Sequence, residues 1–201
     1  MSESTQPTVD HRRAIAQRNA AAILDATERL LARGESLNMR AIAGQAGISR
    51  PTLYAHYKTI GEIVEAVVAR AVAASLEAVQ GARLDDAPAD QALERMLAAS
   101  WAQLARFDAL ARGAAEHLTT GALHRSHQAL MAPLHDLIER GRRDGVFRTD
   151  LPPEWLATMY FSLVHGADEH ARTHSVGRER ALELLTTTAR ELFAGARKEP
   201  A

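Results

Sequence analysis

The sequence predicts an all-α protein of about nine helices, divided into a small amino-terminal domain (residues 1–58) and a larger carboxy-terminal domain (residues 59–201). Hydrophobic residues make up 46% of the chain but aromatic residues only 4%, so the core must be built mainly from small and aliphatic side chains, and Ala and Leu favour helix. Apolar residues recur at helical spacing in most segments, and no segment alternates apolar and polar residues as a half-buried strand does.

The composition also limits the class of protein. There is no cysteine, which excludes disulfides, thiolate nucleophiles and cysteine-ligated zinc. No apolar run approaches the roughly 18 residues that span a membrane, and the first ten residues lack the charged start and apolar core of a secretory signal. We therefore expect a cytoplasmic protein with no membrane partner.

The charge is nearly balanced over the whole chain but unevenly distributed along it. The net charge is −1, while residues 1–70 carry nine Arg or Lys against seven Asp or Glu, leaving an excess of acidic residues in the remainder. The sign of this asymmetry suits an amino-terminal region that contacts nucleic acid. Because the excess is small, phosphate affinity would depend on local placement and on doubling by dimerisation.

The first helix is expected at about residues 12–33, ended by Gly34, after a loose polar tail at residues 1–10. The basic residues His11, Arg12 and Arg13 could reach a DNA phosphate or minor groove, and simple disorder is the competing interpretation. The positions that recur at helical spacing in this helix are Ile23, Leu24, Thr27, Leu30 and Leu31.

Residues 38–58 predict two short helices joined by a tight turn. Asn38 can cap the first helix, and Gly47 can adopt the left-handed backbone that ends it. Ser49 can cap the second helix, with Pro51 in its first turn. The inward side of the second helix is formed by Ile48, Leu53 and Tyr57, and the outward side by Arg50, Thr52, Tyr54, His56 and Lys58. This arrangement is the helix-turn-helix pattern.

The segment PTLYAHYK (residues 51–58) resembles the recognition helix of the tetracycline-repressor-like (TetR) regulators, in which the motif (Pro/Gly)-x-x-Tyr-x-His-(Tyr/Phe)-Lys recurs. The preceding AILDATERLLARG resembles the first helix of that family, and the resemblance covers about residues 15–68. It implies a homodimeric transcription regulator, a repressor released from a palindromic operator by a small molecule. Ile60 stands where the family often has a second lysine, which puts one phosphate contact in doubt.

Chemistry and the resemblance together give the candidate DNA contacts. An Arg at the front of a recognition helix can pair with guanine O6 and N7, and small apolar groups can touch a thymine methyl. Tyr, His and Lys side chains along the same helix suit phosphate oxygens. The candidate DNA-binding residues are Arg40, Ser49, Arg50, Pro51, Thr52, Tyr54, His56 and Lys58.

The carboxy-terminal domain contains few motifs. A capping box at Thr59 and Glu62 predicts that a helix connecting the two domains runs from residue 59 to about 81. Further helices are expected at about residues 88–112, 114–119, 123–143, 153–173 and 177–196.

The resemblance implies that this domain binds a small-molecule effector and dimerises through its last two helices, although ordinary core packing is the alternative for each residue. The candidate ligand-binding residues are Trp101, Leu104, Phe107, His117, Met131, His135, Tyr160, Phe161 and His165. The candidate dimer residues are Trp155, Met159, Leu163, Leu182, Leu185 and Leu192.

Metal, cofactor and enzyme functions are not favoured. Two histidine pairs, His124 with His127 and His170 with His174, have helical spacing, but exposed histidines at helix ends explain them equally well. The HExxH, GxSxG, GxGxxG and GxxxxGK[ST] motifs are absent. We expect no cofactor, no metal and no enzymatic activity. The alternatives are a helical small-molecule-binding protein that has lost DNA reading, and a small helical enzyme.

Overall fold

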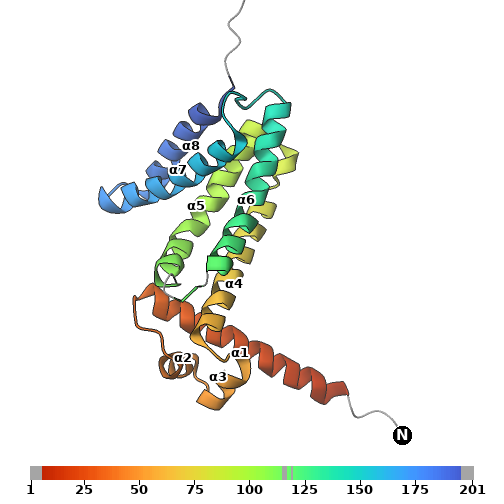
Figure 1. Ribbon diagram of the computed structural model, residues 1–201, viewed down its shortest axis with the longest axis vertical. Coiled ribbons are helices and arrows are strands. Elements are labelled where there is room, and N and C mark those ends of the chain that lie inside the picture. Colours follow the sequence, from red (N-terminus) through yellow and green to blue (C-terminus); the bar gives the residue numbers. More distant parts are fainter. Residues whose placement is uncertain (1–5, 115–116, 119, 196–201) are drawn as a thin grey trace, which may run out of the picture. The chain divides into compact units, whose positions relative to one another are not determined.

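The computed structural model describes residues 6–114, 117–118 and 120–195 (Figure 1). Over these residues the chain forms eight α-helices and one 3-10 helix, together with a single isolated antiparallel bridge between Phe147 and Ala194. The prediction of an all-α fold is therefore confirmed. The chain packs into two compact units: residues 1–70 with 108–123 (unit 1) and residues 71–107 with 124–201 (unit 2).

Unit 1 contains α1 (Gln6–Ala32), α2 (Met39–Ala46), α3 (Arg50–His56) and the first part of α4 (Ile60–Gly81). The helix α1 begins at Gln6, so the expectation of a loose tail over residues 1–10 is wrong where the structure describes them. Pro7 lies in the first turn of α1, where its missing N–H costs little, and Ala and Arg residues further along favour helix. The fully buried side chains at the centre of unit 1 are Ile23, Ile42, Leu53, Ile63, Val64 and Val67.

An ion-pair cluster joins α4 to α1 within unit 1. The Arg70 guanidinium donates to Asp25 at 2.7 Å and to Glu28 at 2.7 and 3.2 Å. Partial burial disfavours the charged guanidinium, but the hydrogen bonds to both carboxylates outweigh it and raise the pKa of Arg70. This cluster fixes the middle of α4 against α1.

Unit 2 is built from the second part of α4, the 3-10 helix η1 (Leu84–Asp86), α5 (Ala89–Ala114), α6 (Thr120–Arg143), α7 (Pro153–Thr173) and α8 (Arg178–Phe193). Its core is mostly aliphatic, and Phe147 packs edge-on against Phe193 with ring centroids 5.4 Å apart. Gly141 is required by close approach, since a Cβ there would overlap the Phe147 ring.

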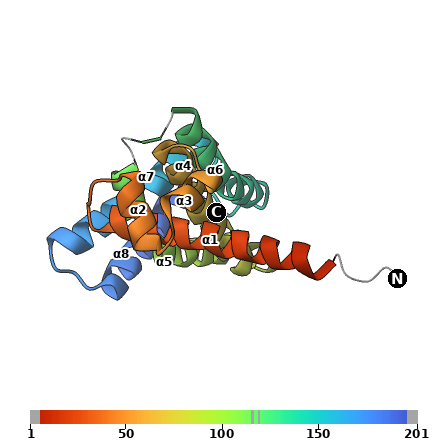
Figure 2. The ribbon, with the colours of Figure 1, turned by 90° about the horizontal axis from the view of Figure 1, so that it is seen from below.

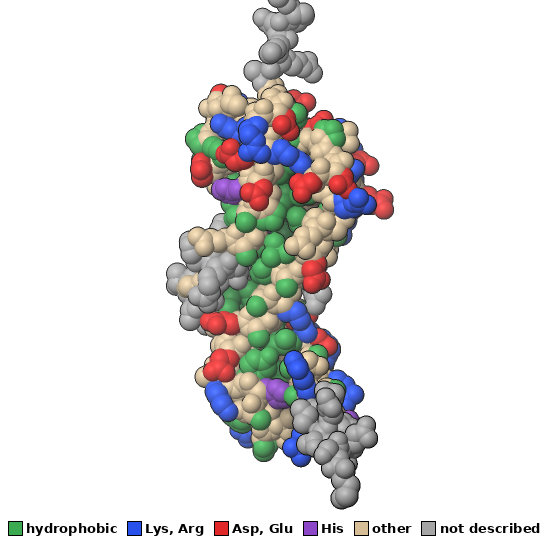
Figure 3. Space-filling model, turned by 90° about the vertical axis from the view of Figure 1, so that its right-hand side faces the viewer, with side chains coloured by type: hydrophobic (Ala, Val, Ile, Leu, Met, Phe, Trp, Pro, Cys, Tyr) green, Lys and Arg blue, Asp and Glu red, His purple; other side chains and the backbone are tan. Residues whose placement is uncertain are grey.

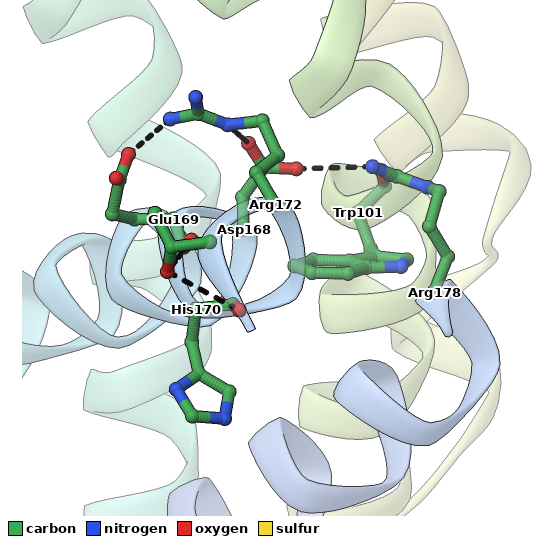
Figure 4. Close-up of polar contacts among 7 residues, drawn as sticks. Trp101, Asp168, Glu169, His170, Arg172 and Arg178 are labelled. Atoms are coloured by element: carbon green, nitrogen blue, oxygen red, sulfur yellow. Dashed lines mark hydrogen bonds and ion pairs between the residues drawn. The ribbon is translucent and has the colours of Figure 1, made fainter. Parts of the chain in front are cut away.

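A buried carboxylate ties three helices of unit 2 together (Figure 4). Asp168 on α7 is 2% exposed and accepts from Arg172 at 3.2 Å and from Arg178 of α8 at 3.0 Å. Arg178 also donates to the carbonyl oxygen of Trp101 on α5 at 2.8 Å and lies over the Trp101 ring, 4.6 Å from its centroid. The charge of Asp168 is thus compensated from two sides.

The predicted short helix at residues 114–119 is not found where the structure describes that segment. Ala114 is the last residue of α5, and His117 and Leu118 lie in a turn in which both backbone N–H groups donate to the carbonyl oxygen of Ala114. Gly113 lies against Leu31 of α1, where an added Cβ would come within 2.7 Å of a Leu31 methyl carbon. This packing places the end of α5 in unit 1.

Candidate nucleic-acid interface and ligand cavity

The turn between α2 and α3 is held by the three residues that the sequence identified. The Asn38 side chain accepts from the backbone N–H of Ala41 at 2.8 Å, and Gly47 has φ 69° and ψ 28°. The Ser49 side chain accepts from the N–H of Thr52 at 3.2 Å. The predicted caps and left-handed glycine are confirmed, so the angle between the two helices is set by local chemistry.

The inward side of α3 packs as predicted, with Leu53 fully buried and Ile48 and Tyr57 partly buried. Partial burial raises the pKa of Tyr57, opposed in part by the nearby Arg70 charge. Both features indicate that the phenol of Tyr57 belongs to the structural side of the helix.

The outward side of α3 presents cations and hydroxyl groups to solvent. Arg50 and Tyr54 are exposed, Tyr54 at 39%, and Arg40 on α2 is also exposed. Thr52 and His56 are half-buried, while Pro51 and Ser49 are exposed. No carboxylate among the described residues forms an ion pair with Arg40 or Arg50, so their charge remains available to an anionic partner.

Three of the predicted contact residues also have roles within the fold. The hydroxyl groups of Ser49 and Thr52 share a hydrogen bond at 2.7 Å, which limits their freedom to turn outward. The Lys58 ammonium donates to the carbonyl oxygen of Tyr54 at 2.7 Å, which leaves two of its three protons for a phosphate. Lys58 is thereby held over the carboxy-terminal end of α3, where a cation is favoured.

The capping arrangement at the start of α4 is close to the predicted one. Thr59 Oγ1 accepts from the N–H of Glu62 at 3.1 Å, as expected for a cap. The Glu62 carboxylate, however, accepts from the N–H of Lys58 at 2.7 Å rather than from that of Thr59. The acidic charge of Glu62 is therefore committed to the backbone that follows α3.

Unit 2 contains a cavity of about 670 Å³, including its part open to solvent. Four predicted ligand residues line it: Leu104, Tyr160, Phe161 and His165. The Tyr160 hydroxyl shares a hydrogen bond with Ser100 at 2.9 Å, and burial raises the pKa of Tyr160, which keeps its phenol protonated. The lining residues that the sequence did not identify are Ser75, Leu76, Val79, Met96, Ser100, Gln103, Leu130, Leu134 and Val164.

Of the other ligand candidates, those whose side chains the structure describes do not line this cavity. Trp101 is buried and covered by Arg178, and Met131 and His135 are half-buried on α6, with Met131 packed against the core. His117 belongs to unit 1. Phe107 lies outside the residues whose side chains the structure describes. The missed residues on α4 are Ser75, Leu76 and Val79. They recur at the same helical spacing as the core residues of α4, so the sequence alone does not separate the cavity face of this helix from its core face.

The predicted dimer residues lie on α7 and α8, and their exposure differs. Trp155 is 51% exposed, whereas Leu185 is buried in the core of unit 2. Met159, Leu163, Leu182 and Leu192 are half-buried. A groove between α7 and α8 is lined by nine residues: Ser162, Leu163, Gly166, Ala167, His170, Ala181, Leu184, Leu185 and Thr188. Leu184, which the sequence did not single out, is 41% exposed there.

The histidine pairs do not form a metal centre in the part of the chain that the structure describes. His170 and His174 stack with ring centroids 4.3 Å apart, and the described residues contain no group of three or more His, Asp or Glu able to hold a metal ion. The side chains of His124 and His127 lie outside the described residues. Within the described helices none is long and apolar enough to cross a membrane.

Comparison with known proteins identifies the amino-terminal unit most clearly. Residues 23–67 match the sequence model of the family described as "Bacterial regulatory proteins, tetR family", a range that runs from α1 to α4. A comparison with curated protein sequences finds no match.

The whole fold is similar to several solved regulators. A bacterial regulatory protein in the tetR family from Rhodococcus RHA1 has a TM-score of 0.75 at 20% identity, covering 88% of this chain and 97% of that one. A TetR family transcription regulator from Marinobacter aquaeolei VT8 has a TM-score of 0.71 at 20% identity, covering 90% of this chain and 98% of that one. The TetR-like regulator LfrR from Mycobacterium smegmatis, solved in complex with proflavine, has a TM-score of 0.63 at 19% identity, covering 88% of this chain and 97% of that one. At these identities the likeness shows the fold alone.

Proposed function

We propose that this chain, whose amino-terminal domain belongs to the tetR family of bacterial regulatory proteins, acts in the cytoplasm as a homodimeric repressor that a small molecule releases from a palindromic operator. The observation that carries this proposal is the outward side of α3: a capped helix that presents Arg50, Tyr54 and Lys58 beside Arg40 of α2. The proposed division at residue 58 separates this DNA-binding part from the ligand-binding and dimerisation part.

Each outward side chain has a proposed role at the DNA. Arg50, at the first position of α3, pairs with a guanine edge in the major groove. Pro51 and Thr52 contact a thymine methyl group. Phosphate oxygens are contacted by Arg40, Ser49, Tyr54, His56 and Lys58, which set the register of the helix on the duplex.

Dimerisation is proposed because one short recognition helix makes few phosphate contacts. The partly exposed apolar side chains of α7 and α8, with Trp155 and Leu184 the most exposed, supply a face that a second copy can cover. A two-fold dimer presents two recognition helices, so the operator half-sites would lie about 34–36 Å apart, one helical turn of DNA.

The cavity of unit 2 is the proposed effector site, and its lining favours an apolar molecule with one or two neutral hydrogen-bonding groups. Ser100, Gln103 and Tyr160 supply neutral donors and acceptors among aliphatic side chains. Binding of proflavine by LfrR, which shares this fold, is consistent with an aromatic effector. A ligand that favours dimers with misplaced recognition helices must weaken operator binding, and by linkage the operator weakens ligand binding by the same factor.

The helix α4 is the proposed connection between the two sites. Its first part packs Ile63 and Val67 into the core of unit 1, and its second part lines the cavity with Ser75 and Val79. A displacement of the second part on ligand binding would therefore be carried into the unit that holds α3.

The test starts from a random DNA pool, from which the protein is used to select binding sequences. We expect a palindromic consensus sequence. In a gel-shift experiment the wild-type protein should retard this DNA, and the double variant Arg50→Ala, Lys58→Ala should not. Failure to enrich any sequence would contradict DNA reading and favour the alternative of a helical ligand-binding protein; turnover of a bound molecule would favour the small helical enzyme.

Ser100→Leu tests the effector arm of the proposal. A larger aliphatic group here would occupy the cavity, so operator binding should persist while release by cavity-binding dyes such as proflavine is lost. Release that is unchanged in this variant would place the effector site elsewhere.

A further inference from the structure

The first half of α1 is longer than the packing of unit 1 requires. Over residues 11–18 every side chain is exposed except that of Ala14, and the first fully buried residue of the helix is Ile23. Both views of the chain show this half of α1 extending away from α2 and α3 (Figures 1 and 2). About two helical turns, residues 11–18, therefore form without contributing to the core.

Residues 11–18 of this extension contain basic but no acidic side chains, although the acidic Asp10 directly precedes them in the same helix. Residues 11–24, HRRAIAQRNAAAIL, contain Arg12, Arg13 and Arg18 with His11, and no acidic residue. All four basic side chains are exposed, and no described carboxylate pairs with any of the three arginines. Figure 3, which faces this part of α1, shows Lys and Arg side chains gathered at the lower end of that face.

The spacing of these cations matches an extended polyanion. His11 and Arg18 lie seven residues apart, on one side of the helix and about 10 Å apart along its axis. Duplex DNA carries about six phosphates over the same length. Arg12 and Arg13 project about 100° and 200° around the axis from His11, so long side chains can reach phosphates on both sides of the helix.

We propose that the basic extension of α1 (residues 11–18) binds the phosphate backbone of DNA flanking the bases that α3 contacts. This inference rests on the proposed function, because α1 and α3 belong to the same unit and would approach the same duplex. An anionic membrane surface is the other polyanion that basic helices bind, but such helices need an apolar face, and Ile15 is the single large apolar residue between 11 and 18.

The extension adds to the unpaired positive charge that Arg40 and Arg50 already give unit 1. Arg33 pairs with Glu35, and Arg70 is held by Asp25 and Glu28. Arg12, Arg13 and Arg18 therefore add three unpaired cations to each copy of the recognition unit, six in a dimer. The extension would raise affinity for all sequences equally, because phosphate contacts carry no sequence information.

The experiment measures binding of the full-length protein to a labelled duplex of random sequence, about 30 bp long, over a range of salt concentrations. The Arg12→Ala, Arg13→Ala, Arg18→Ala triple variant should bind at least tenfold more weakly at low salt. The slope of log K against log salt should fall by up to about five for the dimer. Alanine keeps the helix, which circular dichroism verifies.

Two matched variants define what the change means. The corresponding triple Arg→Lys variant keeps the charge and should keep the wild-type slope, and Gln17→Ala, exposed on the same turns but uncharged, should bind as wild type. A triple-alanine variant with the wild-type slope would overturn the inference. Binding to anionic lipid vesicles that is lost in the triple variant, with DNA binding unchanged, would also overturn it in favour of a membrane surface.

The outcome distinguishes this inference from the function on which it rests. A wild-type protein that shows no salt-dependent binding to any duplex would remove the proposed function and the inference together. Wild-type binding that weakens in Lys58→Ala but not in the triple variant would remove the inference alone.

Discussion

In unit 2, Arg140 and Arg142 near the end of α6 are held by a carboxylate and by carbonyl oxygens, whereas Arg40 and Arg50 of unit 1 extend into solvent without such partners among the described residues. Arg140 donates to Asp85 at 3.1 Å and to the carbonyl oxygen of Leu84 at 2.9 Å. Arg142 donates to the carbonyl oxygens of Arg148, Thr149 and Leu151.

The partners of an arginine, rather than its presence, indicate its task. In unit 2 the guanidinium groups of Arg140 and Arg142 exchange water for fixed acceptors and order a loop or a helix end. In unit 1 the cations of α2, α3 and the start of α1 keep their charge for a polyanion that is not part of the chain. The opposite signs of the two regional charge balances follow the same division.

The largest effect is expected where the paired charges of unit 2 are broken. Asp168→Ala removes the acceptor of Arg172 and Arg178, and should cost about 3 kcal/mol of unfolding free energy because charged hydrogen bonds and packing are lost at a buried site. The half-exposed arginines can regain water, which limits the loss. Urea unfolding measures it.

Glu169→Ala is the matched control for that prediction. Glu169 also contacts Arg172, but from an exposed position on the next residue of α7, so its loss should cost less than about 1 kcal/mol. Equal losses at the two positions would contradict the structural role assigned to Asp168.

A smaller effect is expected in the turn of unit 1. Gly47→Ala forces a side chain into φ 69° and should cost about 1–2 kcal/mol, with DNA affinity reduced as the turn frays. Gly44→Ala lies inside α2 with open space around its Cβ, and should instead stabilise by about 0.5–1 kcal/mol. Thermal unfolding of the pair separates the two; a destabilised Gly44→Ala would indicate that this position is not an ordinary exposed helix site.

The smallest effect concerns an exposed ion pair of unit 2. The hydrogen bond from Arg148 lowers the pKa of the Asp150 carboxyl from 3.8 to about 2. A lowered carboxyl pKa stabilises the fold above the unfolded value and loses that contribution as the pH falls from about 4 to 2. Asp150→Asn should therefore be slightly less stable than wild type at pH 7. In chemical denaturation the difference should shrink below pH 4, and one that persisted unchanged would exclude this pair as its source.

Much of unit 1 could be predicted from sequence because its geometry depends on local chemistry. Asn38, Gly47 and Ser49 each act on backbone within three or four residues, so their roles are visible in the sequence. The start of α1 was misplaced because residues 6–10 carry no apolar stripe; Pro7, in the first turn, is at a position where its missing N–H costs the helix little.

The cavity and the charge cluster of unit 2 depend on which helices meet, which spacing along one helix does not reveal. Trp101 was a reasonable ligand candidate by type, yet it packs under Arg178, 77 residues away. Ser100, its neighbour, lines the cavity through its pairing with Tyr160. The assignments of individual DNA, ligand and dimer contacts remain predictions until the complexes are measured.

The most direct test of the division between the two units is a paired measurement on Arg50→Ala and Arg140→Ala, with DNA affinity and unfolding free energy determined for each. Arg50→Ala should lose about 1–3 kcal/mol of binding, at one base position of the selected operator, with stability changed by less than about 0.5 kcal/mol. Arg140→Ala should lose about 1.5–3 kcal/mol of stability with DNA affinity unchanged. Unchanged DNA affinity and base preference in Arg50→Ala, with a loss of stability instead, would contradict the account.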